Sequence, residues 1–161
     1  MVYKLSKELI GHLSDVKCVN WINENVLVSG SRDLTGRIWS NVNSEWINNY
    51  IIKTHDNYVN SVNYLKPNDE HPNGTGFLFI RLYFYLILLL GLIATGSQDK
   101  IVNLHEILLS EFNAESVVDA PIYTLLGHNG NVCSIDVLED LIVTGSWDSY
   151  VLNCMDLSKC Y

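Results

Sequence analysis

The chain repeats itself three times, and this internal similarity constrains its fold more than any other feature. The repeated element is an apolar run that reaches Ser or Thr and continues with Gly, Ser, one variable residue and Asp. It occurs at Leu27–Asp33, Ile93–Asp99 and Ile142–Asp148. Such a run predicts a buried strand that leaves the core and enters a tight turn.

A second shared element precedes each of these runs. It is a Gly or Thr followed by His, and then a stretch in which apolar and polar residues alternate. The pairs are Gly11-His12, Thr54-His55 and Gly127-His128. Alternation at period two predicts a strand with one buried face. His12 precedes Asp33 by 21 residues and His128 precedes Asp148 by 20, so the two outer repeats agree in spacing.

Together the two elements resemble the WD repeat, in which each unit is a four-stranded blade of a β-propeller. The resemblance predicts an all-β fold: a partial propeller of about three blades with a hydrophobic insert in the second. Blade one is predicted at 11–52, blade two at 53–126 with the insert at 75–91, and an incomplete blade three at 127–161. Three blades cannot close a ring, so we expect an N-terminal portion of a longer protein that is poorly stable alone.

In the WD family a His, a Ser or Thr, an Asp and a Trp form a buried hydrogen-bonded tetrad. The resemblance places the first tetrad at His12, Ser29, Asp33 and Trp39. The second consists of His55, Thr95 and Asp99, with His105 in the Trp position, and the third of His128, Thr144 and Asp148, with Cys154 there. We expect both replacements to weaken the tetrad and to leave those two blades less well fastened.

The same residue types also occur in the catalytic triads of hydrolases. A triad needs one exposed nucleophile beside a cleft, whereas here the set recurs three times in the same order, and no Gly-x-Ser-x-Gly turn is present. We therefore predict no catalytic residue and no enzymatic activity.

Cysteine spacing and charge restrict the possible partners. Cys18, Cys133, Cys154 and Cys160 form no Cys-x-x-Cys pair, so neither a metal site nor a cofactor is predicted, and reduced thiols favour a cytoplasmic and nuclear protein. A net charge of −8 disfavours nucleic acid and anionic membrane surfaces, which bind clustered Lys and Arg.

The second repeat contains surplus residues. His55 precedes Asp99 by 44 residues, and the 18 residues from Phe77 to Ala94 carry a single charge, at Arg81. That length is marginal for a membrane span, and only 15 residues (77–91) lie outside the repeated strand. Since deleting 75–91 restores a continuous blade, we favour a translated unspliced intron. A hydrophobic helix, packed on the propeller or inserted in a membrane, and a lengthened hairpin remain alternatives.

Several local stretches resemble the phospholipase A2-activating protein family. They include Ser31-Arg32-Asp33, Asn60-Ser61-Val62-x-Tyr64 and Thr144-Gly145-Ser146-Trp147-Asp148. The resemblance implies a seven-bladed propeller that binds ubiquitin, followed by domains, missing here, that bind more ubiquitin and an AAA ATPase. The expected function is that of a ubiquitin-binding adaptor fragment in ubiquitin-dependent protein degradation. The alternatives are a WD scaffold of another assembly, a membrane-anchored protein held by 77–94, and a non-functional mis-spliced product.

Partners of WD propellers dock on the face that carries the Gly-His loops. The residues three and five after His and one before Asp point there: Asp15, Lys17, Arg32, Tyr58, Asn60, Gln98, Asn131, Cys133 and Trp147. Trp147 and Tyr58 are the expected anchors, because large aromatic side chains supply much of the energy of interfaces. In the alternative interpretation each residue merely covers a blade edge, and Arg32 with Asp15 is a surface ion pair of small value.

Overall fold

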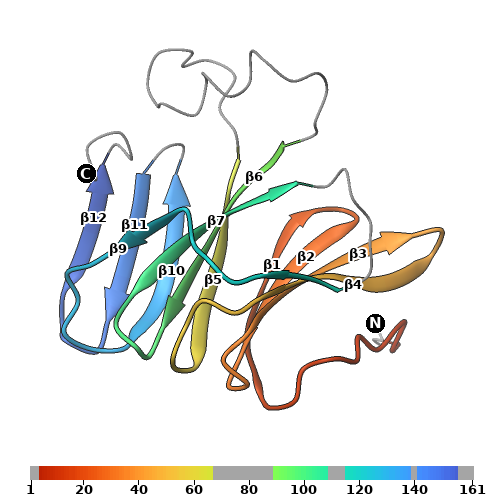
Figure 1. The fold of residues 1–161 in the computed structure, drawn as a ribbon, viewed down its shortest axis with the longest axis horizontal. Helices are drawn as coiled ribbons and strands as arrows, with labels where there is room; N and C mark the ends of the chain where they lie inside the picture. The colour runs from red at the N-terminus through yellow and green to blue at the C-terminus, as the bar shows by residue number, and fades with distance from the viewer. Residues whose placement is uncertain (1–3, 67–88, 109–114, 139–140, 156–161) are drawn as a thin grey trace.

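The computed structural model describes residues 4–66, 89–108, 115–138 and 141–155, and these form twelve strands in three sheets. The sheets stand side by side in chain order, with the first at one end of the row and the third at the other (Figure 1). The prediction of an all-β fold is confirmed, since the described residues contain no helix.

The first sheet is an antiparallel meander of β1 (Val16–Asn23), β2 (Val26–Ser31), β3 (Gly36–Val42) and β4 (Glu45–Ile52). A fifth strand, β8 (Ser116–Val118), pairs in parallel with β4. β8 lies within the segment assigned to blade two, yet it extends the first sheet. The two neighbouring units are thus joined by backbone hydrogen bonds as well as by packing.

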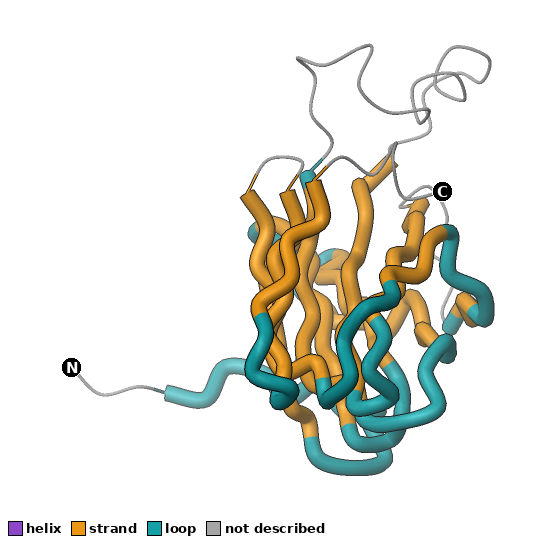
Figure 2. The backbone as a smooth tube through the Cα atoms, turned by 90° about the vertical axis from the view of Figure 1, so that its left-hand side faces the viewer, coloured by secondary structure: helices purple, strands orange, loops and turns teal. Residues whose placement is uncertain are grey.

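The second sheet has the order β5 (Val59–Leu65), β6 (Leu89–Ser97), β7 (Val102–Leu108) and β9 (Tyr123–Leu125). The third has the order β10 (Val132–Leu138), β11 (Leu141–Ser146) and β12 (Val151–Met155). Figure 2 shows the strands stacked with the connecting loops gathered at their ends.

The same register recurs in each sheet. Val16, Val59 and Val132 pair with the Ser of the Gly-Ser-x-Asp element, and a register shift follows each of these Val residues. Pairing therefore defines which positions of the three sheets correspond.

The predicted hydrophobic insert falls mostly outside the described residues. Of 75–91, the structure describes the backbone of 89–91, which belongs to β6, with a register shift between Leu89 and Leu92. The strand thus begins three residues before its predicted start at Leu92. Within the described part of the chain, no helix has the length and apolar character needed to cross a membrane.

Two hydrophobic cores lie between the sheets. The first joins the first and second sheets and contains Val26, Val28, Ile38, Tyr50, Ile52, Val59, Val62, Ile93 and Ile107. The second joins the second and third sheets and contains Leu65, Leu92, Ala94, Val102, Leu104, Val132, Ile135 and Ile142. Each sheet buries apolar side chains against its neighbour, and this stacking fixes the orientation of the loops at the sheet ends.

Candidate functional site

A hydrogen-bonded tetrad fastens the first sheet. His12 Nδ1 lies 2.8 Å from Asp33 Oδ2, and His12 Nε2 lies 2.8 Å from Ser29 Oγ. Trp39 Nε1 donates to the same Ser29 hydroxyl over 2.9 Å. The backbone N–H of Leu13 also donates to Asp33. The predicted four residues of the first repeat therefore meet in one network, which ties the Gly-His loop to the turn between β2 and β3.

The other two repeats build the same triad of His, Thr and Asp. His55 lies 2.8 Å from both Asp99 and Thr95, and His128 lies 2.9 Å from Asp148 and 2.8 Å from Thr144. The hydroxyl-bearing residues Ser29, Thr95 and Thr144 are all buried. A hydroxyl that is buried and already hydrogen-bonded suits a structural fastener, because a nucleophile needs access to substrate.

His105 takes part in the second network in place of Trp. Its Nε2 lies 3.0 Å from Thr95 Oγ1, and its ring is fully buried. The expectation that this replacement breaks the tetrad is therefore wrong in connectivity. A cost remains, because His105 Nδ1 is buried without a hydrogen-bond partner among the described residues.

Residue size explains why the second repeat carries His. In the first repeat a methyl group added at Gly11 would lie 2.9 Å from Cη2 of Trp39, so Gly11 makes room for the indole. Thr54 occupies the corresponding position in the second repeat, and its hydroxyl lies 3.3 Å from His105 Nε2. The smaller imidazole fits beside Thr54.

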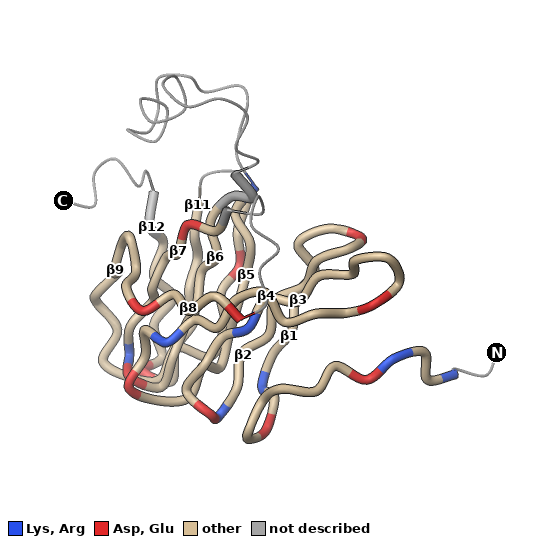
Figure 3. Tube along the Cα trace, turned by 45° about the vertical axis from the view of Figure 1, so that its right-hand side comes forward, with Lys and Arg blue, Asp and Glu red and all other residues tan. Residues whose placement is uncertain are grey.

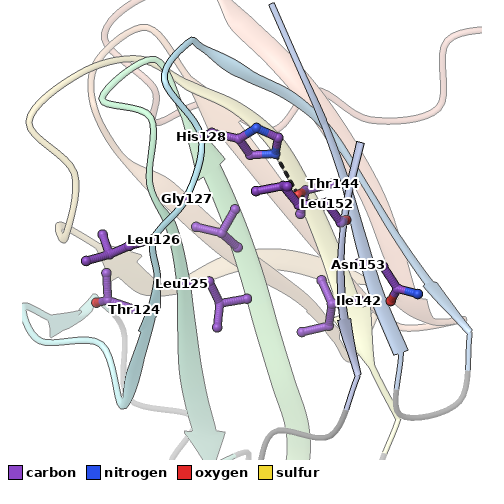
Figure 4. Close-up of a pocket in the computed structure, with 10 residues that line it drawn as sticks. Thr124, Leu125, Leu126, Gly127, His128, Ile142, Thr144, Leu152 and Asn153 are labelled. Atoms are coloured by element: carbon purple, nitrogen blue, oxygen red, sulfur yellow. Dashed lines mark hydrogen bonds between the residues drawn. The ribbon is translucent and has the colours of Figure 1, made fainter. Parts of the chain in front are cut away.

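The third repeat has a cavity beside its network. Cys154 pairs with Ile142 as Trp39 pairs with Leu27, although the Cys154 side chain lies outside the described part of the structure. The cavity has a volume of about 540 Å³, and the His128–Thr144 hydrogen bond lies at its border (Figure 4). Its lining includes Val102, Leu125, Leu126, Gly127, Ile142 and Leu152.

The carboxyl groups of the networks are held in the charged form. Burial raises their pKa values, but the hydrogen bonds that they accept outweigh burial and lower the pKa of Asp33 and Asp99, and that of Asp148 to about 2. Burial lowers the pKa of His12. At neutral pH a neutral imidazole therefore donates from Nδ1 to a carboxylate and accepts at Nε2 from the hydroxyl.

No group of metal-binding side chains occurs among the described residues. Cys18 is partly buried, and burial raises the pKa of its thiol to about 12. Cys133 is exposed, and Cys160 lies outside the described residues.

The predicted partner-binding residues lie above these networks. Arg32 Nη1 lies 2.8 Å from Asp15 Oδ2, and its guanidinium carbon lies 5.5 Å from the centre of the Tyr58 ring. Asp15, Lys17 and Arg32 are exposed. Arg32 thus connects the first sheet to the second at this surface. Figure 3 shows acidic and basic residues side by side in turns along one edge of the molecule.

The same surface continues onto the third sheet. Asn60 Nδ2 donates to Asn131 Oδ1 over 2.8 Å, and the backbone N–H of Gln98 donates to Tyr58 O over 3.0 Å. Asn131 is only 8% exposed, so its predicted place on the open face needs correction: its amide is engaged between two sheets. Trp147, by contrast, is 74% exposed.

Comparison with known proteins agrees with this architecture. The family described as WD domain, G-beta repeat matches residues 3–40 and 119–152. This chain is a WD40-repeat protein. The predicted resemblance to the phospholipase A2-activating protein group is also confirmed, by relatives that align with more than nine tenths of the chain.

Three such relatives are known. Ubiquitin homeostasis protein lub1 of Schizosaccharomyces pombe is 34% identical over 91% of this WD40 chain. Protein DOA1 of Saccharomyces cerevisiae is 30% identical over 92%, and phospholipase A-2-activating protein of Xenopus laevis is 32% identical over 91%. The chain spans 16–17% of the length of these relatives.

Solved structures show the same fold. The WD40 β-propeller domain of Doa1 superimposes with a TM-score of 0.62 at 28% identity, and the match covers 91% of this chain and 39% of that one. A chain of the Polycomb Repressive Complex 2 of Chaetomium thermophilum gives a TM-score of 0.64 at 19% identity, covering 90% and 30%. The chain is therefore a partial WD40 propeller.

Proposed function

We propose that this chain is a ubiquitin-binding part of an adaptor in ubiquitin-dependent protein degradation. The observation that carries the proposal is the relationship to a protein named for ubiquitin homeostasis, which is 34% identical over 91% of the chain. WD40 folds serve as interaction scaffolds, and the buried hydroxyls of the three networks favour binding over catalysis.

We place the ubiquitin contact on the loop surface that Arg32, Tyr58 and Trp147 share. Trp147 offers a large exposed indole, and Tyr58 a phenol ring whose position Arg32 supports. Aromatic side chains of this kind supply much of the binding energy at protein interfaces. The exposed Lys17 and Asp15 border them and supply polar contacts of smaller value. The cytoplasm and nucleus are the proposed location.

Calorimetric titration of the whole chain with monomeric ubiquitin tests the proposal. We expect saturable binding, and Trp147→Ala and Tyr58→Ala should each weaken it roughly tenfold or more. Trp46→Ala is the matched control, because Trp46 packs on Trp21, 5.9 Å between ring centres, toward the opposite end of the first sheet. Absence of binding, or equal loss in all three variants, would contradict the proposal and favour a WD40 scaffold of another assembly.

A further inference from the structure

The two internal interfaces between sheets share one construction. A methyl group added at Gly30 would lie 2.7 Å from Cγ1 of Val59, and one added at Gly96 would lie 2.8 Å from Cγ1 of Val132. In both places the first Val of one sheet packs onto the Gly of the preceding sheet. Val59 and Val132 are fully buried by this contact.

The corresponding side chains of the first sheet are uncovered. Val16, the counterpart of Val59 and Val132, is 51% exposed, and Val19 is 68% exposed. Trp21, on the same face of β1, is 59% exposed. We call Val16, Val19 and Trp21 the knob face.

The complementary surface is uncovered at the other end of the row (Figure 1). Gly145 corresponds to Gly30 and Gly96, but a methyl group placed there would meet, among the described residues, Ser134 of its own sheet alone. Val143 corresponds to Val28, which is fully buried, yet Val143 is partly exposed. We call Ser134, Val143 and Gly145 the socket face.

We propose that the knob face of one copy of this chain packs onto the socket face of a second copy. The argument is continuity with an existing interface, because the joint would repeat at corresponding positions the two contacts already present inside the chain. Such a contact joins different surfaces of the two copies and is therefore head-to-tail.

One side chain marks where the new joint departs from the internal ones. Asn20 Nδ2 donates to Asn63 Oδ1 over 2.8 Å, and Asn63 Nδ2 donates to Ile135 O over 3.2 Å. Asp136 holds the corresponding position in the third sheet, and a carboxylate has no hydrogen to donate onward to the next copy. The joint between copies is therefore weaker than the internal interfaces, and Asp136→Asn supplies the missing donor.

Sedimentation velocity of the 161-residue chain over a range of concentrations tests the proposal. We expect a reversible two-copy species, weakened at least tenfold by Val19→Lys and strengthened severalfold by Asp136→Asn. Val117→Lys is the matched control and should leave association unchanged, because Val117 is 52% exposed on β8, away from both faces.

A mixture of two variants tests the head-to-tail geometry. Val19→Lys damages the knob and Val143→Lys the socket, so each should be defective alone, while the mixture retains one intact knob and one intact socket and should associate. Urea midpoints for each variant establish that the chain still folds. A single-copy species at every concentration, association indifferent to Val19→Lys (as contact through 77–91 would be), or failure of the mixture would overturn the proposal.

Discussion

At the scale of single residues, the size of the residue before His determines which side chain can complete each network. Gly11 leaves room for the Trp39 indole, whereas Thr54 stands beside the smaller His105. The repeats therefore differ at two positions that depend on each other. The sequence predicted the position of His105 but not its hydrogen bond to Thr95, because an imidazole in place of an indole gives no signal of how it will pack.

Replacing His105 with Trp tests this dependence. The single variant His105→Trp should lower the free energy of unfolding by about 1–3 kcal/mol, because the indole overpacks against Thr54. The double variant Thr54→Gly, His105→Trp should recover roughly 1 kcal/mol or more, a coupling measured by urea denaturation of all four members of the cycle. Additive losses would show that the two positions are independent.

The buried His105 also gives stability a pH dependence. Burial, followed by the neighbouring charge of His55, lowers the pKa of His105 to about 3 in the folded chain, from 6.5. As the pH falls below 6.5, the unfolded chain takes up a proton that the folded chain does not, so stability is lost. The loss should reach about 1–2 kcal/mol between pH 6.5 and 5.

Urea midpoints at pH 7, 6 and 5 measure this loss. His105→Gln should show a shallower decline, while His12, whose pKa burial also lowers, keeps the slope above zero. Equal slopes in the parent chain and in this variant would contradict the assignment. The carboxyl groups act at lower pH: their lowered pKa values stabilise the fold above pH 3.8, and this contribution fades as the pH falls toward the pKa of about 2 at Asp148.

At the scale of the elements, Gly in β2 and β6 sets how closely neighbouring sheets approach. The Gly-Ser-x-Asp pattern correctly predicted strands that enter turns, since a β-strand followed by a tight turn has a local signature. It did not reveal that Gly30 and Gly96 receive Val59 and Val132, because contact between sheets joins segments that are distant in sequence. The pairing of β8 with β4 and the burial of Asn131 were missed for the same reason.

Gly30→Ala tests the packing role of this position. The added methyl group would lie 2.7 Å from both Val59 and Cys18, so we expect a loss of about 1–3 kcal/mol in unfolding free energy. Gly36→Ala is the control, because its methyl group would lie 3.4 Å from Ile52, an ordinary contact. Thermal or urea unfolding that ranks the two variants equally would contradict this account of the interface.

At the scale of the whole molecule, three stacked sheets bring residues from distant parts of the sequence to one surface. Arg32 lies over Tyr58, and Asn60 binds Asn131, so the loop surface is continuous across all three sheets. The repeat pattern could predict which residues share this surface, because corresponding positions of stacked repeats align. It could not predict their individual exposure, which depends on contacts between sheets.

The central claim is that this loop surface binds ubiquitin, and site-specific photo-crosslinking tests it most directly. A benzophenone amino acid is placed singly at position 147, 58 or 46, and each chain is irradiated with ubiquitin. The account predicts cross-links from 147 and 58 and none from 46. Cross-links from 46, or none from 147 and 58 under conditions in which ubiquitin is bound, would contradict it.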